Sequence, residues 1–135
     1  MLDLHYLRTH TDRVRSSYKA RGEAVDLDAL LARDADRRRL ITEADALKAR
    51  KNELSKAVGE KKRDGAPEAD LAPLMEESKA VTEQISDLEQ RRTELQAALE
   101  AELLILPNVL HDSVPYGEEP EDNPVVRTWG EPPAF

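Results

Sequence analysis

The sequence predicts an all-α fold: a long antiparallel two-helix coiled-coil hairpin with short N-terminal collar helices and an extended C-terminal linker. Aliphatic residues recur at alternating spacings of three and four on both sides of a polar turn at 64–68, which is the pattern of a coiled coil. Only 4% of the 135 residues are aromatic and 36% are charged, so a thick apolar core is excluded. Six of the eight prolines lie beyond residue 106, which predicts an irregular C-terminal segment.

Two short helices are expected at the start of the chain. Asp3 is placed to cap the first of them, which extends through Arg8. Thr11 is predicted to be the N-cap of the second, Asp12–Ala20, which stops at Gly22 because glycine commonly ends a helix. Their apolar residues form one small set, Leu4, Leu7, Val14 and Tyr18. We expect these helices to pack as a collar against the base of the hairpin.

The third helix is expected to begin after Asp26, whose carboxylate can cap it, and to continue into the arm. The collar then covers about 1–36 and the coiled-coil arm about 37–103. Together they make one domain, 1–107, and the linker follows as 108–135.

The two limbs of the arm can be set in one register. The seam of the outgoing limb consists of Leu40, Ala44, Leu47, Lys51, Leu54 and Val58. The seam of the returning limb consists of Leu71, Leu74, Ser78, Val81, Ile85, Leu88, Arg92, Leu95 and Leu99. Residue numbers add to 132 for Leu47 with Ile85 and again for Leu54 with Ser78. Because one register suits both limbs, an intramolecular hairpin is favoured.

The segment after the arm changes character at Pro107, which ends the returning helix. The apolar run Leu103–Leu106 just before it is predicted to be buried, because it is hydrophobic on all sides. Residues 125–129 could form a single strand, which is not stable by itself. Trp129 and Phe135 have no core within the chain to enter, so we expect an N-terminal piece of a larger protein.

Charge is divided between the limbs, although the whole chain carries −8. Residues 48–63 hold seven basic and two acidic side chains, a balance of +5. Residues 68–102 hold ten acidic and three basic side chains, about −7. Lysine and arginine suit RNA phosphates, while Asn and Ser can reach ribose hydroxyls, and Gly59 would let a helix come close. The predicted RNA-contacting residues are Arg50, Asn52, Ser55, Lys56, Lys62 and Arg63.

The same charges have a simpler interpretation, which stays open at this point. Charged side chains on a two-helix coil form its solvated face, and opposite charges on the two limbs can pair across it.

Other kinds of site find little support. The chain has no cysteine, which excludes disulfides and cysteine-bound metals and fits a reducing cytosol. No stretch resembles a signal peptide or a membrane span, so a soluble cytoplasmic protein is expected. His5, His10 and His111 lack a second ligand at metal spacing. No catalytic or metal-binding residue is predicted, because the carboxylates lie on helix faces rather than in a cleft.

Three stretches carry a family resemblance. The first is Met1-Leu2-Asp3-Leu4 with Arg8, Val14, Arg21-Gly22 and Asp26-Leu27-Asp28. The second is Arg50-Lys51-Asn52-Glu53-Leu54-Ser55-Lys56-Ala57-Val58-Gly59. The third is Leu106-Pro107-Asn108-Val109-Leu110-His111-Asp112-Ser113-Val114-Pro115 with Gly117, Asp122-Asn123, Arg127, Trp129-Gly130 and Pro132-Pro133. They resemble the N-terminal domain of bacterial-type seryl-tRNA synthetase, its distal-arm signature and its link to the catalytic domain. Thr11 and Leu110 depart from the family pattern, in which proline is usual at both places.

The resemblance implies that the chain is the tRNA-binding domain of a class II serine–tRNA ligase, a cytoplasmic enzyme of protein biosynthesis. It implies that the arm recognises the long variable arm of serine tRNA and guides the acceptor end to a catalytic domain that this chain lacks. ATP and Mg²⁺ are then cofactors of the parent enzyme, which is a homodimer. The chain alone is expected to be an inactive monomer without a cofactor.

Two alternatives remain beside this interpretation. The arm could be a structural coiled coil that assembles subunits and binds no RNA. The chain could also be a free-standing synthetase-like protein with another RNA or protein partner.

Overall fold

The computed structural model of the chain describes residues 2–117, 119–131 and 133. Met1, Pro132 and Phe135, which enter the predictions above, lie outside the described residues. Within the described ranges the chain forms four α-helices and one short 3-10 helix, so the all-α prediction is confirmed. Two compact units contain them: Asp28–Ile105 is one, and Met1–Leu27 with Leu106–Phe135 is the other.

The smaller unit begins with α1 (Leu4–Thr9) and α2 (Thr11–Ala20). Leu7, Val14 and Tyr18 are buried, as their apolar pattern predicted. The predicted N-cap at Thr11 is wrong, because Thr11 is the first residue of α2 and its hydroxyl donates to the Leu7 carbonyl at 2.7 Å. The Val14 amide donates to the carbonyl of His10, which takes the N-cap position without a side-chain cap. Because α1 ends at Thr9, the carbonyls of its last turn lack helical N–H partners, and one of them accepts the hydrogen bond from the Thr11 hydroxyl.

The start of the linker is bound to α2. Leu110 donates its backbone N–H to the buried Ser17 hydroxyl at 2.8 Å, and the Arg21 guanidinium donates to the carbonyl of Asn108 at 2.8 Å. The pair Arg13–Asp112 adds an exposed salt bridge at 2.8 Å. These bonds give the first residues of the linker a defined path along α2.

Later in the linker the residues that the structure describes are irregular, apart from the single turn of η1 (Pro120–Asp122). The predicted strand at 125–129 is wrong, since these residues have no regular secondary structure. An isolated extended segment has no neighbouring strand to bond with. Trp129 is 88% exposed, with the Arg127 guanidinium 5.9 Å from its ring centroid. Among the described residues Trp129 therefore enters no core, as expected.

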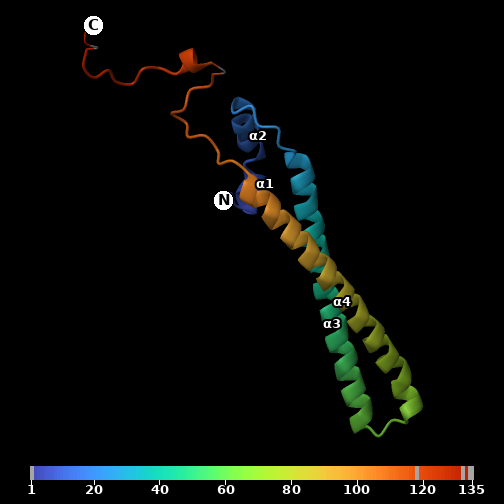
Figure 1. Ribbon diagram of the computed structural model, residues 1–135. Helices are drawn as coiled ribbons and strands as arrows, with labels where there is room; N and C mark the ends of the chain where they lie inside the picture. The colour runs from blue at the N-terminus through green and yellow to red at the C-terminus, as the bar shows by residue number, and fades with distance from the viewer. Residues whose placement is uncertain (1, 118, 132, 134–135) are drawn as a thin grey trace. The chain divides into compact units, whose positions relative to one another are not determined.

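The larger unit is the predicted hairpin, with α3 (Leu27–Arg63) and α4 (Glu68–Ile105) packed antiparallel (Figure 1). The turn between them covers 64–67, and Gly65 adopts a φ of 72°, which favours glycine. Near the start of α3, Asp34 is fully buried and bound by Arg37 at 3.0 Å and Arg38 at 3.2 Å. Two guanidinium partners compensate the desolvation of this carboxylate.

The seam of the hairpin follows the predicted register. Leu54 is 2% exposed and packs with Val81 and Ile85, and the partly buried Leu47 and Leu74 cover this cluster. The other buried apolar residues on the two limbs include Leu40, Ala44, Leu71 and Leu99. These contacts join α3 to α4 within one chain.

At the returning end one prediction is wrong in part, and it concerns the apolar run before Pro107. Arg92, at its seam position, is exposed, which spares its guanidinium the cost of desolvation and fits a long side chain that reaches outward from the seam. In the apolar run before Pro107, Leu103 is buried, whereas Leu104 is 72% and Ile105 82% exposed. Consecutive helical residues point about 100° apart, so one buried face cannot take in all of them.

Within the described part of the chain, no helix combines the length and the apolar character that crossing a bilayer requires.

Candidate nucleic-acid interface

The heptad positions of α3 decide which basic residues lie together. Because Lys51 and Leu54 belong to the seam, Arg50 lies on one flank of it and Lys48, Ser55 and Lys62 on the other. The remaining predicted contact residues point outward on the same side as Lys62. We call the set Asn52, Ser55, Lys56, Gly59, Lys62 and Arg63 the basic face. Its acidic neighbours Glu53 and Glu60 lie on the side of Arg50.

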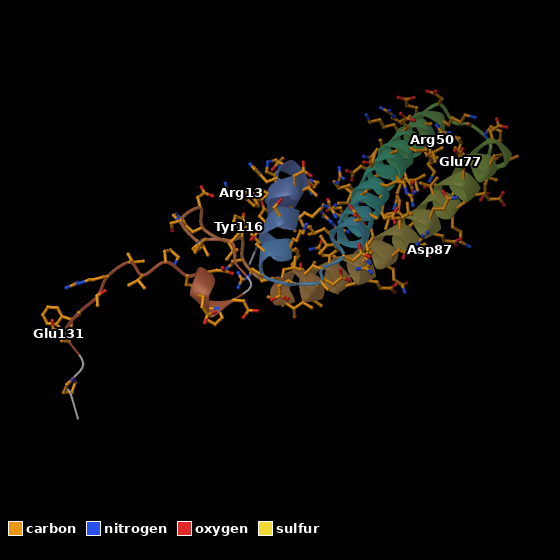
Figure 2. All side chains as sticks on the ribbon, turned by 90° about the horizontal axis from the view of Figure 1, so that it is seen from above. Arg13, Arg50, Glu77, Asp87, Tyr116 and Glu131 are labelled. Carbon is orange, nitrogen blue, oxygen red and sulfur yellow. The ribbon has the colours of Figure 1, made fainter. Side chains whose placement is uncertain are left out.

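The Arg50 side chain forms ion pairs within the hairpin. Its guanidinium donates to Glu77 of α4 at 2.7 Å and to Glu53 at 3.3 Å (Figure 2). The hydrogen bond to Glu77 is the main cause of the raised pKa of Arg50, and the bond to Glu53 contributes less. The interpretation in which opposite charges pair across the limbs therefore holds for this residue.

Lys48 is paired in the same way on the opposite flank of the seam. Its ammonium lies 2.7 Å from Glu89 of α4, and this hydrogen bond is the main cause of the lowered pKa of that carboxyl. The ion pairs Arg50–Glu77 and Lys48–Glu89 thus link α3 to α4 on the two flanks of the seam. They lie near the stretch where the seam holds Lys51 and Ser78 instead of aliphatic side chains.

The cations of the basic face have no such partners. Asn52, Lys56 and Lys62 are exposed and make no side-chain hydrogen bond or ion pair with any residue in the described ranges. Among the described residues, the exposed Arg63 side chain bonds only to the Gly59 carbonyl, at 3.4 Å from its Nε. Three positive charges are therefore available on one side of α3, which suits a polyanion.

The hydroxyl of Ser55 already donates its hydrogen bond within α3. Its hydroxyl donates to the Lys51 carbonyl at 2.9 Å, so toward a ligand it presents only lone pairs. An acceptor suits a ribose 2′-hydroxyl, which can donate, and does not suit a phosphate oxygen, which cannot.

The structure also brings together residues that the sequence did not link. Lys19 of α2 and Arg21, which caps its C-terminal end, line an open cleft of about 910 Å³ with Tyr116, Glu119 and others from the linker. Among the described lining residues two basic side chains, Lys19 and Arg21, stand against two acidic ones, Glu119 and Asp122. Sequence reasoning could not find it, because its two sides are separated by nearly the whole chain.

No metal centre is formed by the described residues, in which no three potential ligands among His, Asp and Glu come together. His10 stacks on Tyr6 with 4.4 Å between ring centroids and contacts the Thr9 hydroxyl through Nδ1 at 2.8 Å. His111 contacts Ser113 through Nδ1 at 2.9 Å. These contacts are local to each histidine.

Fold and charge together define a class of domain: an antiparallel helical hairpin with one unpaired basic face on its outgoing limb. The family model described as the seryl-tRNA synthetase N-terminal domain matches residues 1–110. The chain belongs to this family, as its three resembling stretches indicated.

Similar proteins agree with this assignment. The chain is 39% identical over its whole length to a serine–tRNA ligase of Desulfitobacterium hafniense (strain Y51), and 42% identical over 133 residues to one of Synechococcus sp. (strain JA-2-3B'a(2-13)). It covers 31% of each relative. In the crystal structure of seryl-tRNA synthetase from Pyrococcus horikoshii complexed with ATP, the match has a TM-score of 0.87 and 29% identity. That match covers 96% of this chain and 29% of the other.

Proposed function

We propose that the hairpin binds serine tRNA through the basic face of α3 and recognises its long variable arm. In this proposal residues 1–107 are the tRNA-binding domain and 108–135 are the linker. Binding positions the acceptor end of the tRNA for ATP- and Mg²⁺-dependent serylation by a catalytic domain of the full-length enzyme. The observation that carries the proposal is the difference between paired and unpaired cations. Arg50 and Lys48 are used within the hairpin, whereas Lys56, Lys62 and Arg63 remain available.

The chemistry of the basic face suits the backbone of double-helical RNA. Lys56, Lys62 and Arg63 can neutralise phosphates, and Ser55 can accept from a 2′-hydroxyl. A helix reads such a surface by shape and backbone, because the deep major groove of RNA hides the bases. Family membership supports tRNA as the RNA, and an exposed helix face suits a long helical arm.

The experiment is a binding titration with two RNAs. The 135-residue chain is titrated against serine tRNA and against the same tRNA without its variable arm. We expect clearly weaker binding of the shortened tRNA. With three phosphates contacted, the plot of log affinity against log salt should have a slope of about −2 to −3. Equal affinity for both RNAs would contradict recognition of the variable arm, and a flat salt response would contradict the electrostatic contact.

A charge variant tests the face itself. Replacing Lys56, Lys62 and Arg63 together by glutamine should weaken tRNA binding about tenfold or more and flatten the salt slope by about 2–3. The control is Lys79→Gln, which removes one exposed charge from α4 and should leave affinity nearly unchanged. Equal effects of the two variants would show that the charge of the basic face is not specifically used.

A further inference from the structure

Neither a backbone angle nor a close contact among the described residues accounts for glycine at position 59. Of the five glycines, Gly22, Gly65 and Gly130 have positive φ values, and a Cβ on Gly117 would lie 2.2 Å from the Cβ of Asp122. Gly59 has neither feature. It lies within α3, its φ is not positive, and a Cβ added there would meet no described atom within 4 Å beyond its chain neighbours and the backbone of its own helical turns.

Glycine at such a position weakens the helix. It has more backbone freedom to lose on folding than any other residue, and alanine would fit without strain. The turn that reverses the hairpin is served by Gly65, six residues later, and does not need a second glycine. The missing side chain is therefore explained by something outside the chain.

The side chains around Gly59 indicate what kind of ligand would approach it. On a helix, the neighbours of a residue are those three and four positions away, about 5–6 Å between Cβ atoms. For Gly59 these are Ser55, Lys56, Lys62 and Arg63, which are four of the six residues of the basic face. The bare backbone thus forms a notch bordered by three cations and one hydroxyl oxygen.

We propose that this notch is the point of closest approach between α3 and the sugar-phosphate backbone of the bound RNA. The inference rests on the proposed function and assigns Gly59 the role of a positioning residue. A ribose or phosphate lies against the bare helix backbone, which brings Lys56 and Lys62 within reach of the phosphates on either side. Ser55 accepts from a 2′-hydroxyl at the edge of the notch. A side chain at position 59 would hold the RNA away from all of them.

The test uses two substitutions that the helix tolerates. In the 135-residue chain, Gly59→Ala should raise the melting temperature by about 2–4 °C, because it removes the conformational cost of glycine. The same variant should bind serine tRNA about tenfold more weakly. Gly59→Leu, which is bulkier but equally compatible with a helix, should weaken binding further. The control is Ala80→Leu, which adds the same side chain at an exposed position of α4 and should leave affinity unchanged.

The outcomes separate the inference from the proposed function. A higher melting temperature with weaker binding supports the notch. Unchanged affinity of both Gly59 variants overturns it, while the glutamine variant of the basic face still tests tRNA binding independently. A lower melting temperature of Gly59→Ala would also overturn it, since the glycine would then serve the fold. If the Gly59 variants and the glutamine variant all bind like the unmodified chain, the proposed function fails as well.

Discussion

At the scale of single residues, local pairing decides which charges are available. Arg50, Lys48 and Lys56 lie within nine positions on one helix, yet the first two are bound to carboxylates of α4 and the third is not. Exposed ion pairs contribute little to stability, so the main consequence of these two is that a carboxylate offsets the charge that Arg50 and Lys48 would otherwise present to a ligand.

The burial of Tyr18 affects how the stability of the chain depends on pH. Its hydroxyl oxygen is buried and has no hydrogen-bond partner among the described residues. Burial is the main cause of its raised pKa; Arg21 lowers the pKa and Glu23 raises it, both to a smaller extent. The folded chain therefore keeps the Tyr18 proton at pH values where the unfolded chain releases it, so stability falls as the pH rises through about 10.

Tyr18→Phe should remove this part of the pH dependence. At pH 8 the variant should be at least as stable as the unmodified chain, because an unpaired buried hydroxyl costs roughly 1 kcal/mol or more. Between pH 8 and 10.5 its melting temperature should fall less than that of the unmodified chain. The control is Tyr116→Phe at a position that is 70% exposed, which should keep the original pH dependence. A parallel fall of all three melting curves would contradict the assignment to Tyr18.

At the scale of elements, the hairpin is held by a thin seam rather than by a core. Leu54, Val81 and Ile85 form its buried centre, and the polar pair Lys51 and Ser78 belongs to the same stretch of seam. Ion pairs flank this stretch on both sides. The basic face is thus presented by a helix whose position depends on a few aliphatic contacts.

Leu54→Ala should therefore be costly for an arm of this kind. Removing a leucine that is 2% exposed typically costs about 2–4 kcal/mol in free energy of unfolding. Urea denaturation followed by circular dichroism measures the loss. Leu104→Ala, at a helix position that is 72% exposed, should change the free energy by less than about 0.5 kcal/mol. Equal losses from the two substitutions would mean that the seam is not the stabilising contact.

At the scale of the whole molecule, net charge and binding surface have opposite signs. The chain carries −8, and residues 68–102 on α4 hold ten acidic side chains, whereas the basic face on α3 presents three cations. General repulsion between the chain and RNA then disfavours other modes of binding, while the face retains local attraction.

The seam also predicts the state of association. Because Leu54 is already covered by Val81 and Ile85 of its own chain, a second copy has no free seam to enter. Light scattering should give a mass near 15.2 kDa that does not change with concentration. A mass of about twice that value, rising with concentration, would instead favour the alternative in which the coiled coil assembles subunits.

The sequence by itself determined the elements that depend on local pattern. Heptad spacing predicted two limbs and the register that joins Leu47 to Ile85, because a coiled-coil repeat is encoded by neighbours three and four positions apart. The polar run predicted a turn at 64–68, one residue longer than the turn at 64–67 in the structure. Charge counting found the basic stretch of α3, and three motifs indicated the family that the comparisons then established.

Only the tertiary structure decided what depends on partners distant in sequence. The capture of Arg50 by Glu77 requires knowing which α4 carboxylate faces it, and the absence of a strand at 125–129 requires knowing that nothing lies beside it. The Thr11 hydroxyl was misassigned because cap residues and helix-interior threonines look alike until the preceding carbonyls are placed. Gly59 shows the same division. The sequence shows that residue 59 is glycine, but only the structure shows that a Cβ there would meet no described residue beyond its own stretch of helix.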